Sequence, residues 1–68
     1  MIVTRTSDFK KIDLSNCQKV WVNGETYKVT LNTYWGDNKY DAYDETGRCV
    51  VSGSLYQDLI ERISYATR

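Results

Sequence analysis

The chain has 68 residues, with nine basic and nine acidic side chains and no histidine. This length allows a single domain with a small core. The balanced charge argues against a dedicated nucleic-acid binder. Without histidine, the usual general base at neutral pH is missing. No apolar run approaches the roughly 20 residues of a membrane-spanning helix, so we expect no membrane segment. Taken together, these features lead us to expect one cytoplasmic, non-enzymatic domain over residues 1–68, without a cofactor.

The N-terminal part has the weakest pattern, and we expect residues 1–17 to form an irregular or short-helix lead-in. The β-branched run at residues 2–4 favours a short strand. Residues 8–12 suit one turn of helix capped by Ser7 or Asp8. That turn would direct Phe9 and Ile12 toward the core.

A first hairpin is predicted at Asn23-Gly24, because this dipeptide separates two β-rich runs and favours a two-residue turn. Such a turn sets three facing pairs: Val22 with Glu25, Val20 with Tyr27, and Gln18 with Val29. The apolar side chains then share one face, at Val20, Val22, Tyr27, Val29 and Leu31. The other face carries Lys19, Trp21, Thr26, Lys28 and Thr30. The turn and the alternation therefore specify the same register.

A second hairpin is predicted at Asp44–Gly47, where glycine supplies a left-handed residue after a type I turn. It places Tyr43 opposite Cys49 and Ala42 opposite Val50. With a reversal between the two hairpins, the predicted strands are 18–23, 26–34, 39–44 and 48–52. We therefore expect an antiparallel β-meander of about four strands over residues 18–52.

A C-terminal amphipathic helix is predicted over residues 54–66. Ser54 and Gln57 have the spacing of a capping box, in which each side chain satisfies a backbone N–H of the other residue. Apolar side chains then recur at helical spacing, at Leu55, Leu59, Ile60 and Ile63. The predicted fold class is α+β: a small antiparallel β-meander packed by this one helix.

The two cysteines, Cys17 and Cys49, are too few for a disulfide scaffold. We expect two reduced, partly buried thiols, and a single bridge between them is the alternative. A metal site is not expected, because two cysteines without histidine leave at least two ligands to find.

The acidic residues gather in one segment: residues 37–45 carry four acidic side chains and one basic side chain, with tyrosines between them. Two interpretations stay open. The acids either keep a solvated hairpin from adding further strands, or they surround a contact surface for a basic protein partner. That contact surface would consist of Trp35, Asp37, Tyr40, Asp41, Tyr43, Asp44 and Glu45.

Trp21 lies on the polar face of the first hairpin, and its surroundings permit two interpretations. Another part of the chain covers the indole, or the indole stacks on a base of single-stranded nucleic acid with Lys19 and Lys28 beside it. The second interpretation makes these three residues an alternative binding site.

In size, compactness and abundance of Tyr, Asn, Asp and Lys, the chain resembles the small accessory proteins with which bacteriophages and mobile elements bind and block host machinery. The resemblance implies an inhibitor or adaptor. We therefore predict a protein-binding module that acts through the acidic segment on a basic, nucleic-acid-binding partner. The alternative is a weak single-strand binder, and self-association through an unpaired sheet edge is a third hypothesis.

Overall fold

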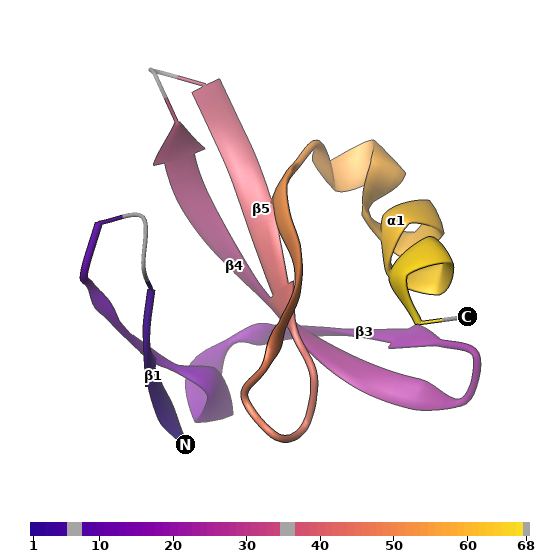
Figure 1. The fold of residues 1–68 in the computed structure, drawn as a ribbon, viewed down its shortest axis with the longest axis horizontal. Helices are drawn as coiled ribbons and strands as arrows, with labels where there is room; N and C mark the ends of the chain where they lie inside the picture. The colour runs from indigo at the N-terminus through magenta and orange to yellow at the C-terminus, as the bar shows by residue number, and fades with distance from the viewer. Residues whose placement is uncertain (6–7, 35–36, 68) are drawn as a thin grey trace.

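The main sheet has four antiparallel strands with one helix packed on it, and a two-stranded sheet lies beside it (Figure 1). This computed structural model describes residues 1–5, 8–34 and 37–67, and for residues 33, 34 and 37 it describes the backbone alone. The elements are β1 (Ile2–Thr4), β2 (Lys11–Asp13), the 3-10 turn η1 (Leu14–Asn16), β3 (Gln18–Val22), β4 (Glu25–Tyr34), β5 (Asp37–Tyr43), β6 (Cys49–Ser54), the 3-10 turn η2 (Tyr56–Asp58) and α1 (Leu59–Ala66). The predicted α+β meander is confirmed, because the strand order is β3-β4-β5-β6.

The first hairpin, β3 with β4, has the predicted register. Val22 faces Glu25, and the pairing continues without a break to Gln18 and Val29. Asn23 and Gly24 have φ angles of 52° and 81°, the two left-handed residues that a type I′ turn needs. Strand β4 has ten residues and β3 has five, so β4 extends beyond β3 and pairs there with β5 alone.

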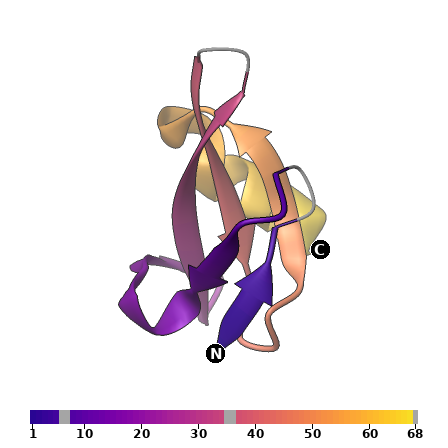
Figure 2. The same cartoon turned by 90° about the vertical axis from the view of Figure 1, so that its left-hand side faces the viewer.

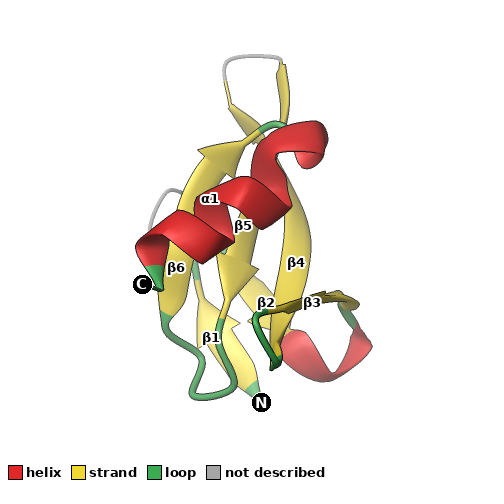
Figure 3. Ribbon diagram, turned by 90° about the vertical axis from the view of Figure 1, so that its right-hand side faces the viewer, coloured by secondary structure: helices red, strands yellow, loops and turns green. Residues whose placement is uncertain are grey.

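Helix α1 crosses the sheet in front of β5 and β6 (Figure 3). Its buried side chains are Leu59 and Ile63, which are 1% and 0% exposed and lie one turn apart on the same face. The core comprises Val22, Tyr27, Val29, Ala42, Val51, Leu59 and Ile63. Burying a side chain of the size of leucine or isoleucine stabilises the fold by about 1.5–3 kcal/mol.

Three apolar side chains that the sequence assigned to the core are exposed instead. Leu31 is 52% exposed, Leu55 is 44% exposed and Ile60 is 56% exposed. Leu55 precedes the 3-10 turn and so lies outside the helix. The eight-residue helix presents a narrow apolar stripe and covers only part of the sheet, which leaves Ile60 and Leu31 exposed. Leu31 has the predicted facing but lies beyond the area that the helix covers.

The predicted start of the helix and its capping box are wrong. Ser54 is the last residue of β6, and its hydroxyl donates to the Leu55 carbonyl at 2.8 Å. The chain then makes the 3-10 turn η2 before α1 begins at Leu59, and neither element has a side-chain cap at its N-terminus. Among the described residues, no helix is both long enough and apolar enough to cross a membrane.

The second hairpin keeps the predicted turn but not the full predicted register. Tyr43 faces Cys49 as expected, whereas Ala42 faces Val51 and not Val50. A β-bulge between these two pairs adds one residue to β6. Gly47 has a φ of 87° and donates to the Asp44 carbonyl at 3.1 Å, as the predicted three-residue loop requires.

The N-terminal residues form a hairpin, so the predicted helical turn at residues 8–12 is wrong. Val3 of β1 faces Ile12 of β2, which makes Ile12 part of a strand. Phe9 is 80% exposed and has a φ of 57°, so it points outward at the connection between the strands. This N-terminal hairpin and α1 lie on opposite sides of the main sheet (Figure 2).

Candidate functional site

Asp41, predicted to lie on the contact surface, is buried inside the protein. It is 1% exposed, and its carboxylate accepts a hydrogen bond from the Gly53 backbone N–H at 3.0 Å and one from Asn32 Nδ2 at 3.2 Å. These bonds join β5 to β6 and to β4. A buried carboxylate needs such partners, so Asp41 supports the sheet and is not a surface contact.

The second correction concerns Tyr43, which is 5% exposed. Tyr43 and Asp41 lie two residues apart on β5 and so share one face, on the side of the sheet where the N-terminal hairpin packs. Arg5 of that hairpin is 6% exposed, and both Asp41 and Tyr43 help to raise its pKa after the larger effect of its hydrogen bond to Asp8. The part of this face around Asp41 and Tyr43 is therefore covered by the N-terminal hairpin.

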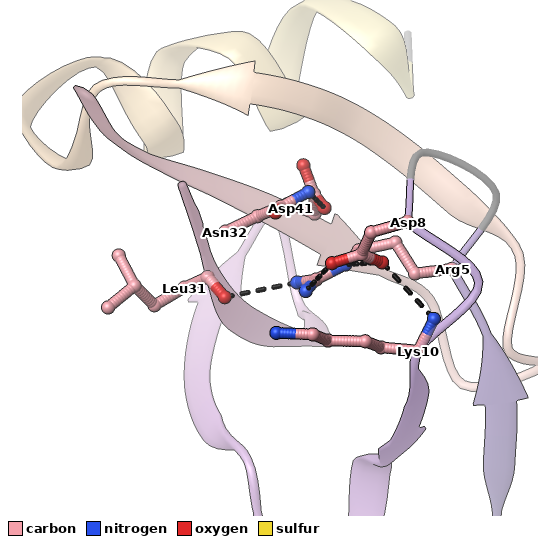
Figure 4. A network of polar contacts seen from close by, with 6 residues as sticks. All are labelled: Arg5, Asp8, Lys10, Leu31, Asn32 and Asp41. Carbon is pink, nitrogen blue, oxygen red and sulfur yellow. Dashed lines mark hydrogen bonds and ion pairs between the residues drawn. The ribbon is translucent and has the colours of Figure 1, made fainter. Parts of the chain in front are cut away.

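The guanidinium of Arg5 connects the N-terminal hairpin to the sheet (Figure 4). Its Nε and Nη2 donate to the two carboxylate oxygens of Asp8 at 2.9 and 2.6 Å, and its Nη1 donates to the Leu31 carbonyl at 3.0 Å. The hydrogen bond from Arg5 is the main reason that the pKa of Asp8 falls to about 2. This two-pronged geometry is the strong form of an arginine–carboxylate pair.

The remaining acids of the predicted surface divide between turn-forming and exposed positions. The Asp44 carboxylate accepts from the backbone N–H groups of Thr46 and Arg48 at 2.9 and 3.0 Å. Burial alone would raise the pKa of Asp44, but the hydrogen bonds from Thr46 and Arg48 lower it overall. Glu45 is exposed at the tip of the turn. Trp35 and the side chain of Asp37 lie outside the described residues.

A cluster of apolar and aromatic side chains lies on the helix side of the sheet, beyond the edge of the core. We call it the tyrosine patch and define it as Leu31, Tyr40, Tyr56 and Ile60. Leu31 faces Tyr40 across β4 and β5, and the rings of Tyr40 and Tyr56 meet edge to face with centroids 5.1 Å apart. Tyr56 is 48% exposed and Ile60, four residues later, is 56% exposed. Tyr40 is half-buried, so it anchors the patch to the core.

Uncharged polar groups accompany the tyrosine patch. Gln18, the first residue of β3, donates its side-chain amide to the Tyr56 hydroxyl. Asn38 is exposed and lies two residues before Tyr40, which places it on the same face of β5. The patch thus combines an apolar centre with amide and phenol groups, and carboxylates and ammonium groups are not among the contacts that define it.

Sequence reasoning named Tyr40 as a contact and assigned Leu31 and Ile60 to the core, so it missed the patch. No signal in the sequence marked the patch, because a helix over residues 54–66 would be long enough to place Leu55, Leu59 and Ile63 on one stripe. The later start of α1, at Leu59, changes which apolar residues are covered.

A second exposed surface lies on the other face of the first hairpin. We call it the lysine–tryptophan face and define it as Lys19, Trp21, Thr26 and Lys28, which share this face because side chains alternate along a strand. Trp21 is 70% exposed, so of the two interpretations the one in which another part of the chain covers the indole is wrong. Lys19 is exposed and faces the half-buried Lys28 directly across the two strands.

A groove of about 450 Å³ runs between β6 and the outer flank of α1. It is lined by Val50, Val51, Ser52, Arg62, Tyr65 and Ala66. Among the described residues, the lining of this groove includes no acid and no cysteine. A neighbouring pocket that shares Val50 and Ala66 with it is lined by Asp44, Arg48, Cys49 and Thr67 as well.

The thiols of Cys17 and Cys49 are both free, as the sequence predicted. Cys17 is half-buried, and Cys49 is exposed as a residue although its thiol is partly buried and donates to the Val51 carbonyl at 3.3 Å. Burial is the main reason that the pKa of each thiol is raised. A raised pKa keeps a thiol protonated at neutral pH and therefore weakly nucleophilic. Among the residues that the structure describes, no three His, Cys, Asp or Glu side chains gather in a way that would hold a metal ion.

The chain matches no protein-family model, no curated protein and no solved structure.

Proposed function

We propose that this protein is a non-enzymatic protein-binding module and that its contact surface is the tyrosine patch. The observation that carries the proposal is the exposure of Tyr56, Leu31 and Ile60 around the Tyr40–Tyr56 ring contact. Exposed apolar side chains that gather around an aromatic pair and are edged by polar groups are typical of an interaction site. Tyrosine is also enriched among the residues that dominate binding energy at interfaces.

The chemistry of the patch favours a protein partner over a nucleic acid or an anionic membrane. Its polar groups are the amides of Gln18 and Asn38 and the hydroxyls of the two tyrosines. Phosphates attract cationic side chains, and the patch does not include one. An apolar centre edged by neutral hydrogen-bonding groups suits a protein surface of the same kind.

The sequence-based hypothesis of a basic partner relied on the acids of residues 37–45. Burial of Asp41 and the turn-forming role of Asp44 leave Glu45 as the exposed acid among those whose side chains the structure describes. The proposal therefore moves the contact from the acidic hairpin to the tyrosine patch. An inhibitor or adaptor of host machinery remains the kind of role that such a module performs.

Site-specific photo-crosslinking in the native host tests the proposal. A benzophenone amino acid replaces Tyr56 in one variant and Tyr65 in another. Tyr65 is the matched control, because it is a tyrosine 71% exposed that lines the groove on the outer flank of α1. The expected result is a discrete adduct with another protein from position 56 and none from position 65.

Two outcomes would contradict the proposal. Equal adducts from both positions would mean that the patch has no special role in contact. An adduct with the mass of two copies of this 7.9 kDa chain would replace an external partner with self-association, the third hypothesis from the sequence.

A further inference from the structure

The lysine–tryptophan face has an arrangement that folding alone does not favour. Lys19 and Lys28 are directly opposite each other on neighbouring strands, a position in which like charges repel and destabilise a sheet. Trp21, two residues from Lys19 on the same strand, is 70% exposed. Neither the repulsion nor the exposed indole contributes to the core.

The N-terminal hairpin covers only part of this side of the sheet. Thr30 and Asn32, farther along β4 on the same face as Lys28, are 7% and 5% exposed. The cover ends before Trp21, so the indole and the two ammonium groups share one open stretch of the first hairpin. Glu25, the acid within this hairpin, faces Val22 and belongs to the other face.

We propose that the lysine–tryptophan face binds single-stranded nucleic acid. The Trp21 indole stacks on an unpaired base, and the Lys19 and Lys28 ammonium groups pair with backbone phosphates beside that base. Aromatic side chains on a sheet with nearby cations are the general platform for single strands, because every base offers a flat face to an indole. The two lysines supply the local positive charge that the neutral chain lacks as a whole.

Other anionic ligands fit this face less well. A duplex hides its base faces within the stack, so the indole would have no planar partner. An acidic protein segment would satisfy the two lysines but would leave the indole without a ring to stack on. The face lies on the opposite side of the first hairpin from Gln18 and the core, so it is also separate from the tyrosine patch.

Tryptophan fluorescence provides a direct test. The substitution Trp35→Phe leaves Trp21 as the single tryptophan of the chain, because the sequence has two. We expect saturable quenching of Trp21 when this variant is titrated with oligothymidylate at low ionic strength. Two phosphate contacts predict that the logarithm of the binding constant falls with the logarithm of salt concentration with a slope of about −1.4.

Variants separate stacking from charge. Trp21→Ala should weaken binding of a labelled oligonucleotide by about 5- to 150-fold, the range for loss of one stacked base. The double variant Lys19→Gln/Lys28→Gln should flatten the salt dependence while the fluorescence of Trp21 still reports binding. Tyr56→Ala should leave binding within about twofold, since the tyrosine patch is a different surface. A thermal melt of each variant shows that it is folded.

Three results would overturn the inference. One is the absence of quenching up to about 0.1 mM oligonucleotide, the weak limit of non-specific binding. Another is equal affinity for duplex DNA, for poly-glutamate of matched charge or for anionic lipid vesicles, each of which would replace stacking with simple charge attraction. The third is quenching in the wild-type chain that disappears in the Trp35→Phe variant, which would place the contact at Trp35.

Discussion

The guanidinium of Arg5 donates a hydrogen bond of 3.0 Å to the main-chain carbonyl of Leu31. Strand β3 pairs with β4 only as far as Val29, so Leu31 lies where β4 has lost its neighbour on that side. Val22 and Glu25 are the hydrogen-bonded pair that closes the two-residue turn, so the backbone groups of Glu25 point toward β3. Backbone groups alternate in direction along a strand, and the Leu31 carbonyl, six residues later, therefore points to the same side, where β3 has already ended. Arg5 thus occupies a backbone group that would otherwise be available to an added strand.

Removing this side chain should loosen the N-terminal hairpin. Arg5→Met should lower the free energy of unfolding by about 1.5–3 kcal/mol, the usual contribution of a hydrogen bond that involves a charged group. Lys10→Met is the matched control, because Lys10 is an exposed cation of the same hairpin; it should change stability by less than about 0.5 kcal/mol. Urea unfolding measures both. Equal losses in the two variants would show that charge alone matters.

The Arg5–Asp8 pair should make stability depend on pH in the acid range. The pKa of Asp8 is lowered from 3.8 to about 2 in the folded chain, so the folded state favours the ionised carboxylate. The stabilisation is therefore complete above about pH 4 and is lost as pH falls toward 2. Urea unfolding between pH 7 and pH 2 should show this loss, and Asp8→Asn should reduce it. An identical pH profile in Asp8→Asn would contradict the pairing.

Asp41 should behave as a structural carboxylate and not as a binding residue. Asp41→Ala leaves the Gly53 N–H and the Asn32 amide without their acceptor, so it should lower the free energy of unfolding by about 2–4 kcal/mol. Asp41→Asn keeps one oxygen as an acceptor and should cost less. Chemical denaturation of the two variants gives the comparison. An Asp41→Ala protein as stable as the wild type would contradict the structural role and would support the earlier prediction that Asp41 is a surface contact.

The two faces of α1 should differ sharply in their sensitivity to truncation. Leu59 is 1% exposed and Ile60 is 56% exposed, although they are neighbours in sequence. Leu59→Ala should cost about 2–5 kcal/mol through lost burial and the cavity it leaves. Ile60→Ala should change stability by less than about 1 kcal/mol. Thermal or urea unfolding of both variants checks the orientation of the helix. Similar losses of stability in the two variants would contradict the orientation in which Leu59 faces the sheet and Ile60 faces solvent.

Local chemistry explains what the sequence could predict. Asn23-Gly24 determines its own turn type, and a two-residue loop leaves one register that groups the aliphatic residues. The Asp44–Gly47 turn was predicted for the same reason, and it formed. Its strands departed from the predicted pairing at Val50, because a bulge is set by packing against the rest of the sheet and not by the turn.

The parts that could not be predicted depend on distant contacts. The β-branched run at residues 2–4 did indicate the first short strand, but the strand at 11–13 has too little pattern to be recognised. The docking of this hairpin relies on Arg5 reaching Leu31, 26 positions away in sequence. The acidic segment looked like a surface because alternation alone does not reveal that the N-terminal hairpin covers Asp41 and Tyr43. The start and length of α1 also could not be predicted, and they determine which apolar side chains stay exposed to solvent.

Binding of the cross-linked partner, purified and titrated by calorimetry, tests the central claim most directly. Tyr56→Ala should weaken the affinity by at least about 30-fold, the loss expected for a residue that dominates an interface. Tyr65→Ala, the matched control on the outer flank of α1, should bind within about twofold of the wild type. Both variants must first show a cooperative unfolding transition. An unchanged affinity for Tyr56→Ala, with a large loss for Tyr65→Ala, would contradict the account and move the contact to the β6–α1 groove.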